Sequence, residues 1–255
     1  MSAQPNVSLE GRVALVTGST TGLGKSIAAR LSDAGAMVAM NFARNVERAE
    51  AAFETFQSNG GQGALFRGDV TDAEDVPRLI EEIKGKLGPV DVLVCNATPE
   101  QPQLPIEEYD WDFHQQMIDF FVKSPFLLTR AILPHLRRQR WGRILNIGSE
   151  VFDRGLPNFS PYVAAKGAQR GWTRSMATEL APDQITVNMV SPGWIPVERH
   201  DDDPEEMKQG YFQLIPLQRW GVPDDIGHAV AFMCSEQAGF ITGQTLVVNG
   251  GMTVC

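Results

Sequence analysis

Short apolar runs alternate with longer amphipathic stretches along almost the whole chain. Runs such as Val92–Cys95 and Arg143–Ile147 carry apolar residues on both faces, as strands in a sheet that is covered on both sides do. The stretches between them repeat their apolar positions at helical spacing. The alternation indicates an α/β fold in which crossover helices join parallel strands.

This pattern predicts the elements of one sheet. Strands are expected at Val13–Thr17, Val38–Phe42, Ala64–Arg67, Val92–Cys95, Arg143–Ile147, Thr186–Val190 and Thr245–Val248. Helices are expected at Gly22–Ala34, Val46–Ser58, Ala73–Leu87, Ile106–Arg138, Pro161–Leu180 and Asp224–Ser235. Because these elements use the chain from Arg12 to Val248, we expect residues 1–255 to form a single domain. The polar segment Trp194–Ile215 is longer than an ordinary connection, and we expect a substrate lid there, at about residues 194–215, with a short helix around Glu205–Phe212.

Charge and composition exclude several classes of protein. The chain carries 22 Lys and Arg against 31 Asp and Glu, a net charge of −9, whereas a nucleic-acid-binding protein needs a basic surface. Met1–Gly11 holds no apolar run behind a basic segment, and no apolar stretch is long enough to span a membrane. Cys95, Cys234 and Cys255 are scattered, and no histidine has a neighbour at ligand spacing. We therefore expect a cytoplasmic protein with no nucleic-acid, membrane or metal partner.

A glycine-rich loop follows the first predicted strand and opens directly into a helix. Glycines allow a tight turn and a close backbone approach, and the helix N-terminus offers free N–H groups to a pyrophosphate. The loop therefore predicts a dinucleotide site, with contacts expected from Gly18, Ser19, Thr20, Thr21, Gly22, Leu23 and Gly24.

A second set of residues follows the fifth predicted strand. Tyr162 and Lys166 are four positions apart, on one face at the start of a predicted helix, and Ser149 precedes Tyr162 by 13 residues. Together with the glycine loop, Asn96-Ala97 after the fourth strand and Pro192-Gly193 after the sixth, this spacing resembles the single-domain short-chain dehydrogenases/reductases. The resemblance runs from Gly11 to Gly251.

The resemblance implies a Rossmann-like, doubly wound, seven-stranded parallel sheet with helices on both faces, a nicotinamide cofactor, and hydride transfer between a carbonyl and an alcohol. Tyr162 would be the proton donor and Ser149 a second donor to the substrate oxygen. A free tyrosine has a pKa of about 10, which a neighbouring ammonium lowers. Lys166 would supply that charge and hold the nicotinamide ribose. Further cofactor contacts are expected from Asn96, Ala97, Pro192, Gly193 and Ile195.

One position in the central helix departs from this pattern. Family members usually carry there an Asn that holds a water between the lysine and solvent, and the aligned residue here is Phe121, which can neither donate nor accept. Thr98 likewise stands where Gly is usual. Three interpretations stay open: another water path, an unusual substrate site with slow turnover, or a weakly catalytic, cofactor-binding sensor or scaffold.

The end of the second predicted strand favours NADP(H), with NAD(H) as the alternative. Phe42 stands where NAD-preferring enzymes carry an Asp that repels a 2′-phosphate. Asn41 lies beside it, and the guanidinium of Arg44 is suited to binding a phosphate. Asp69 and Val70 are expected to flank the adenine.

The sequence is less specific about the substrate than about the cofactor. Candidate contacts are Glu100, Phe121, Glu150, Phe152, Asn158 and Trp194, with Arg199 and His200 in the lid. They suggest a polar, hydroxylated or cationic substrate such as a sugar or polyol.

A 3-oxoacyl-carrier-protein reductase is the second candidate. Arg137, Arg138 and Arg140 could dock an acidic carrier, but Pro182-Asp183-Gln184 replaces the second basic patch of that subfamily. The resemblance of the last strand to the family's subunit interface implies a homotetramer.

Overall fold

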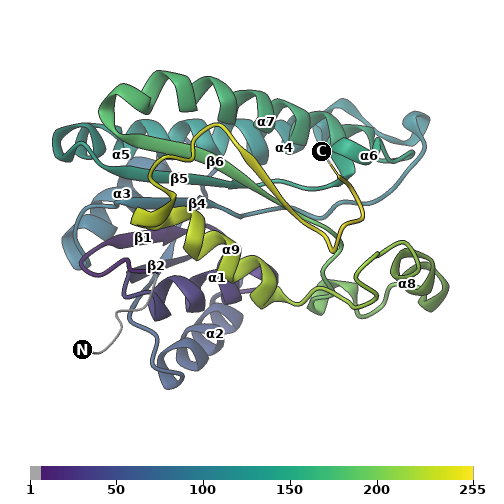
Figure 1. Ribbon diagram of the computed structural model, residues 1–255, viewed down its shortest axis with the longest axis horizontal. Coiled ribbons are helices and arrows are strands. Elements are labelled where there is room, and N and C mark those ends of the chain that lie inside the picture. The colour runs from purple at the N-terminus through teal and green to yellow at the C-terminus, as the bar shows by residue number, and fades with distance from the viewer. Residues whose placement is uncertain (1–6, 255) are drawn as a thin grey trace.

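Seven parallel strands form the centre of the structure, a computed structural model that describes residues 7–254 (Figure 1). The strands are β1 (Val13–Val16), β2 (Met37–Phe42), β3 (Gly63–Arg67), β4 (Val92–Cys95), β5 (Gly142–Ile147), β6 (Ile185–Pro192) and β7 (Thr245–Val248). The helices are α1 (Gly22–Asp33), α2 (Val46–Ser58), α3 (Asp75–Lys86), α4 (Trp111–Ile118), α5 (Ser124–Gln139), α6 (Val151–Arg154), α7 (Ser160–Leu180), α8 (Glu205–Phe212) and α9 (Pro223–Cys234). Cys255 and residues 1–6 of the expected domain lie outside the described residues.

The strand order is β3-β2-β1-β4-β5-β6-β7, and every neighbouring pair is parallel. The order reverses between β1 and β4, and ligands of such sheets bind beyond the carboxyl ends of the strands at this point. The predicted fold class is therefore confirmed, and β1, β4 and β5 direct their following loops to one edge of the sheet.

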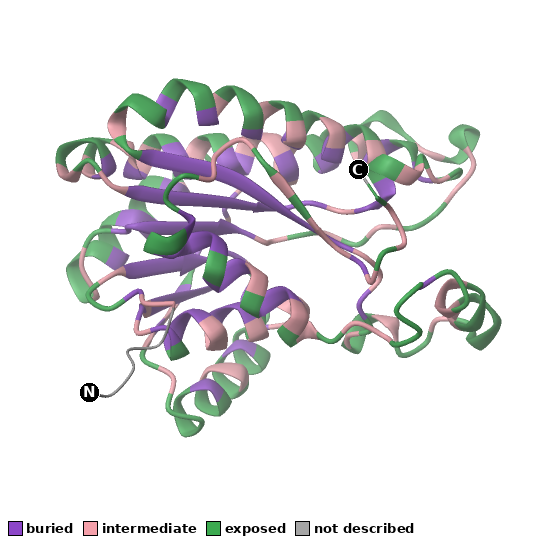
Figure 2. Ribbon diagram, in the orientation of Figure 1, coloured by how far each residue is buried: buried purple, intermediate pink, exposed green. Residues whose placement is uncertain are grey.

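Two apolar layers cover the two faces of the sheet. Ala14 and Val16 of β1 face α1 and α9, where Ile27 and Val230 are fully buried. The alternate β1 residues face the layer formed by α3, α5 and α7. Figure 2 shows the central strands as buried, edge strand β7 as intermediate to exposed, and the outer helix faces as exposed. In the described part of the chain, no helix is both long and apolar enough to cross a membrane.

The prediction of one continuous helix at Ile106–Arg138 is wrong. A 3-10 turn at Ile106–Glu108 ends before Asp110, whose side chain accepts a hydrogen bond from the backbone N–H of Phe113 at 2.7 Å and caps α4. Between α4 and α5, Asp119–Lys123 forms a π-helical turn. Such turns widen the helix locally and occur often at functional sites. Phe121 lies in the middle of this turn.

The segment from Trp194 to Ile215 leaves the layers at the end of β6, and the helix expected at Glu205–Phe212 is present as α8. Figure 1 shows α8 apart from the stacked helices, beyond the edge of the sheet. The short helix α6, directly after Ser149, is absent from the predicted elements, because four residues are too few to show a helical period.

Candidate active site and its cofactor loop

Two amides, buried Asn41 and half-buried Asn96, hold the glycine loop. The Asn41 amide oxygen accepts a hydrogen bond from the Gly18 N–H at 3.3 Å, and the Asn96 amide donates to the Gly18 carbonyl at 3.1 Å. A Cβ on Gly24 would approach the Gly18 carbonyl oxygen to 2.4 Å, so only glycine fits there. Gly22 has a φ of +51°, a left-handed backbone that favours glycine. These contacts explain why the loop needs its glycines and give the expected residues Asn41 and Asn96 a loop-bracing position.

The first turn of α1 binds a carboxylate. The Gly22 N–H donates to Glu198 at 3.1 Å, and Lys25 forms an ion pair with the same side chain. Burial alone would raise the pKa of Glu198, but hydrogen bonds from Lys25 and Gly22 hold that pKa below its ordinary value. Thr21, the N-cap residue, makes no side-chain cap hydrogen bond in the part of the chain described. Carboxylate oxygens on a helix N-terminus stand in for phosphate oxygens, so this end of α1 fits the pyrophosphate of a dinucleotide.

Ser149, Tyr162 and Lys166 come together where β5 ends against α7. Tyr162 and Lys166 are both buried on α7, and the interaction of Ser149 with the Tyr162 phenol acts to lower the phenol pKa against the larger effect of burial. The Phe121 ring packs edge-on against the Tyr162 ring, with their centroids 5.3 Å apart. Phe159 packs against the other side of Tyr162 at 5.0 Å. The three residues expected from the sequence thus form one cluster, with Phe121 as part of its wall.

The Lys166 ammonium has three electron-rich partners. It donates to the Ile147 carbonyl at 2.6 Å and to the Gln169 amide oxygen at 3.2 Å, and it lies 3.7 Å from the centroid of the Phe121 ring. The last contact is a cation–π interaction. Phe121 therefore touches both residues whose chemistry its position was expected to affect.

The protonation behaviour differs from the sequence expectation. Burial raises the pKa of the Tyr162 phenol, and the hydrogen bond to Ser149 and the charge of Arg199 only partly oppose this. Burial, together with the positive charge of Arg199, lowers the pKa of Lys166 well below its ordinary value. The expected lowering of the Tyr162 pKa therefore depends on keeping Lys166 charged in a buried place.

A family model described as enoyl-(acyl carrier protein) reductase matches residues 18–253. The 3-oxoacyl-(acyl-carrier-protein) reductase FabG of Staphylococcus aureus is 41% identical over 241 residues, which cover 94% of this chain and 97% of the relative. The chain belongs to the short-chain dehydrogenase/reductase family. FabG of Haemophilus influenzae is 39% identical over 247 residues, 96% of this chain and 99% of the relative.

A solved structure is similar over nearly the whole of this short-chain dehydrogenase/reductase. It is a protein from Agrobacterium tumefaciens provisionally assigned as a gluconate dehydrogenase, with a TM-score of 0.91 and 30% identity, covering 97% of this chain and 98% of that one. Family membership makes the protein an oxidoreductase that uses a nicotinamide cofactor for carbonyl and alcohol chemistry.

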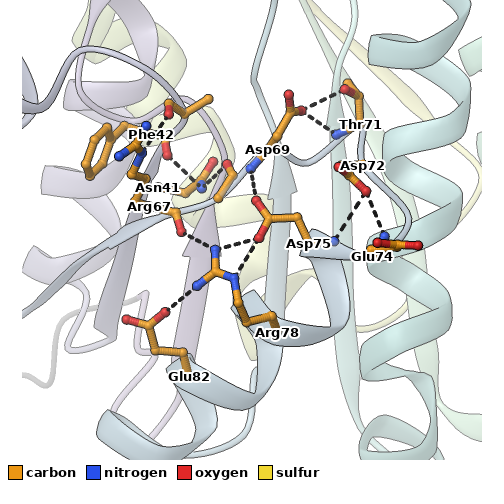
Figure 3. Close-up of polar contacts among 12 residues, drawn as sticks. Asn41, Phe42, Arg67, Asp69, Thr71, Asp72, Glu74, Asp75, Arg78 and Glu82 are labelled. Atoms are coloured by element: carbon orange, nitrogen blue, oxygen red, sulfur yellow. Dashed lines mark hydrogen bonds and ion pairs between the residues drawn. The ribbon is translucent and has the colours of Figure 1, made fainter.

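Where the sequence predicts the adenosine end of the cofactor, Phe42 of β2 is the register partner of Arg67 of β3. The Arg67 Nε donates to the Ala43 carbonyl at 3.2 Å, which places a second guanidinium beside exposed Arg44. Figure 3 shows Arg67 close to Phe42, while Arg78 is bound to Asp75 and Glu82. Sequence reasoning missed Arg67, because only the pairing of β2 with β3 brings it to Ala43.

Asp69 and Val70 follow β3, as expected for residues beside the adenine. The Asp69 carboxylate accepts from the backbone and hydroxyl of Thr71 at 2.9 and 2.7 Å, and Val70 is buried. Both residues lie past the end of β3, and their contact with the adenine stays a prediction.

Of the expected substrate residues, Phe121 lies in the catalytic cluster, but Glu150 has other partners. Glu150 is 2% exposed, and its carboxylate accepts from Tyr211 at 2.6 Å, Arg154 at 3.0 Å and Asn249 at 2.9 Å. The backbone N–H of Trp194 donates to the Tyr211 hydroxyl at 2.6 Å. Glu150 therefore connects the loop after Ser149 with the lid segment and with the end of β7.

The other three, Phe152, Asn158 and Glu100, are exposed. Phe152 packs against Arg170 of α7, with 5.3 Å between the guanidinium carbon and the ring centroid. Asn158 has a left-handed φ of 58°. Within residues 7–254, no group of three His, Cys, Asp or Glu side chains is arranged to bind a metal.

Proposed function

We propose that the protein is an NADP-preferring carbonyl reductase or alcohol dehydrogenase acting on a small polar substrate, such as a sugar acid or another hydroxylated ketone. One observation carries the proposal. Tyr162 and Lys166 are buried, the Lys166 ammonium lies 5.5 Å from the centroid of the Tyr162 ring, and Ser149 and Arg199 each oppose the rise in the Tyr162 pKa that burial causes.

Tyr162 and Ser149 act on the substrate oxygen in different ways. When bound, the nicotinamide supplies or accepts the hydride. Negative charge then develops on the carbonyl oxygen, and Tyr162 donates a proton to it while Ser149 donates a hydrogen bond. In the opposite direction, the Tyr162 phenolate takes the proton of the alcohol. Lys166 stabilises that phenolate as long as it is an ammonium.

Arg199 favours an anionic group on the substrate over the cationic one that the acidic candidates suggested. Its positive charge opposes the rise in the pKa of Tyr162 that burial causes and adds to the lowering of the Lys166 pKa. The carboxylate of Glu150 is occupied by three donors of the chain itself. A guanidinium is suited to a carboxylate, and the A. tumefaciens protein assigned to gluconate supports this substrate class.

The preference for NADP rests on the end of β2. The apolar Phe42 leaves that end without a carboxylate that would repel a 2′-phosphate, and Arg44 and Arg67 offer two guanidinium groups nearby.

A 3-oxoacyl thioester is the second candidate substrate, because the curated relatives are reductases of that class. Two of the arginines that could dock an acidic carrier already have partners within the chain. Arg137 is paired with Asp183 at 2.9 Å, and Arg140 donates to the Pro182 carbonyl at 2.9 Å. The free positive charge that a carrier would meet is therefore reduced.

A substrate panel tests the proposal. Purified protein is assayed at 340 nm with NADPH and 5-ketogluconate, neutral ketoses or acetoacetyl-coenzyme A, and in the reverse direction with NADP⁺ and gluconate or polyols. We expect turnover with a carboxylated substrate and a loss of at least 100-fold on Tyr162→Phe with cofactor binding retained. Arg199→Gln should raise KM for carboxylated substrates only. Tight cofactor binding with no turnover on any member would instead favour a sensor.

We further propose a homotetramer. Phe240 and Leu246 are exposed at edge strand β7 and the turn before it, and Trp111 and Phe126 are exposed on α4 and α5. Exposed aromatic and aliphatic side chains on two separate faces suit two kinds of subunit contact.

A further inference from the structure

Gln169 lies one helical turn after Lys166 on the buried face of α7. It is 1% exposed, and its amide oxygen accepts from the Lys166 ammonium at 3.2 Å. A buried amide is costly unless it is hydrogen-bonded, and a hydrogen bond to a charged partner is stronger than one to a neutral partner. The contact with Lys166 therefore offers a reason for a polar residue on this face.

The neighbouring positions on the same face have other functions. Ala165, Ala177 and Leu180 pack into apolar clusters, and the Thr173 hydroxyl donates to the Gln169 backbone carbonyl at 2.8 Å within the helix. Within the described residues, the Gln169 amide is the side chain that accepts a hydrogen bond from Lys166, whereas Phe121 offers the face of its ring.

Lys166 needs such partners to stay charged. Its burial and the nearby Arg199 both disfavour the ammonium, and a neutral amine would no longer stabilise the Tyr162 phenolate. The Ile147 carbonyl, the Gln169 amide oxygen and the Phe121 ring all interact with the charged form. Of these three, the Gln169 side chain can be removed without changing the backbone or the packing around Tyr162.

We propose that Gln169 is a positioning residue whose amide oxygen keeps Lys166 protonated and directed toward Tyr162, in place of the polar side chain that Phe121 cannot provide. The proposal rests on the proposed function, in which Tyr162 is the acid and base.

Gln169→Leu tests it in the direction of alcohol oxidation, with NADP⁺ and whichever alcohol the panel identifies. Without the acceptor, Lys166 loses its proton more easily, so the Tyr162 pKa rises. The limb of the pH–rate profile in which the rate increases as Tyr162 ionises to the phenolate therefore moves to higher pH. We expect a shift of about one pH unit, equivalent to a tenfold loss of kcat on the limb, with KM within twofold of the parent value.

Two comparison variants separate positioning from general loss of structure. Gln169→Glu keeps an acceptor for the Lys166 ammonium, so its limb should move less than that of Gln169→Leu. Gln139→Leu removes a hydrogen bond that the Gln139 amide donates to Asp91 at 2.8 Å, remote from Tyr162. This variant should lower Tm without moving the limb. An unchanged limb in Gln169→Leu, or equal upward shifts in the Leu and Glu variants, would overturn the proposal. Gln169→Met replaces Gln169→Leu if that variant does not fold.

A second readout needs no substrate. The tyrosinate absorbance of the NADP⁺-bound protein is titrated, and the titration of Tyr162→Phe is subtracted to isolate Tyr162. The Tyr162 transition should lie about one pH unit higher in Gln169→Leu than in the parent. Coincident transitions would overturn the inference, whereas absence of turnover with all panel substrates would count only against the proposed function.

Discussion

Arg44 is an exposed residue two positions after Phe42, where the ribose of the cofactor is expected. A guanidinium hydrogen-bonded to a 2′-phosphate contributes roughly 1.5–3 kcal/mol, and NAD(H) has no such phosphate. We expect Arg44→Ala to raise the Kd of NADPH about tenfold and to leave the Kd of NADH within twofold. Fluorescence titration with both cofactors measures this.

Arg48→Ala is the matched control, since Arg48 is exposed on α2 and only its backbone N–H bonds to Asn45, at 2.9 Å. Equal weakening of both cofactors in Arg44→Ala would contradict a phosphate contact.

At the scale of residues, the sequence predicted those site residues that belong to local motifs. It did not predict residues whose contacts join elements far apart in the chain. Ser149, Tyr162 and Lys166 are recognisable because their spacing along the chain is fixed by one strand and one helix. Glu198 and Tyr211 carry no such signal. Their partners, Gly22 and Glu150, are 176 and 61 residues away, so only the folded chain shows the contacts.

At the scale of elements, the segment 194–215 is attached to α1 at the expected pyrophosphate site. Glu198 binds the Gly22 N–H and Lys25, and a groove of about 440 Å³ lies beside this contact. A cofactor pyrophosphate must compete with the carboxylate for the same donors. We expect Glu198→Gln, which removes the charge and keeps the shape, to lower the Kd of NADPH about fivefold, roughly 1 kcal/mol.

Isothermal titration at low salt measures this effect, and Glu205→Gln on exposed α8 serves as the control for a general change of net charge. A Kd that is unchanged or higher in Glu198→Gln would show that the carboxylate does not compete with the cofactor.

Glu150 joins three elements through one buried carboxylate. Its partners are Arg154 of α6, Tyr211 of α8 and Asn249 after β7. Glu150→Leu leaves these polar groups without their acceptor, and we expect a loss of about 3 kcal/mol in the free energy of unfolding. Urea denaturation measures the loss.

Glu150→Gln keeps one acceptor oxygen and should cost about 1 kcal/mol. Faster proteolysis within residues 194–215 should accompany the Leu variant, because Tyr211 is one of the attachments of that segment. Equal stability of the Leu variant and the parent would contradict the bridging role.

The central helix shows where periodicity misleads at the scale of elements. The apolar spacing from Ile106 to Arg138 continues across Asp110 and through the π turn at Asp119–Lys123. A capping aspartate inside an otherwise periodic stretch was the available signal for the first break. The π turn has no comparable signal in the residue types, because it adds one residue to a turn without changing which side chains are apolar.

At the scale of the molecule, the apolar side chains left exposed predict assembly. The Phe126 side chain is 47% exposed on α5, and Leu246 is 37% exposed on edge strand β7. Covering a phenylalanine stabilises an interface by roughly 2 kcal/mol, and a glutamate at the same place would have to be desolvated.

We expect the parent to be a tetramer by light scattering coupled to size exclusion. Phe126→Glu should be a dimer with an unchanged far-ultraviolet spectrum, because it disrupts the helix face and leaves the β7 edge intact. Val46→Glu, at a 41% exposed position on α2, should stay tetrameric, and a monomeric parent at micromolar concentration would contradict the proposed assembly.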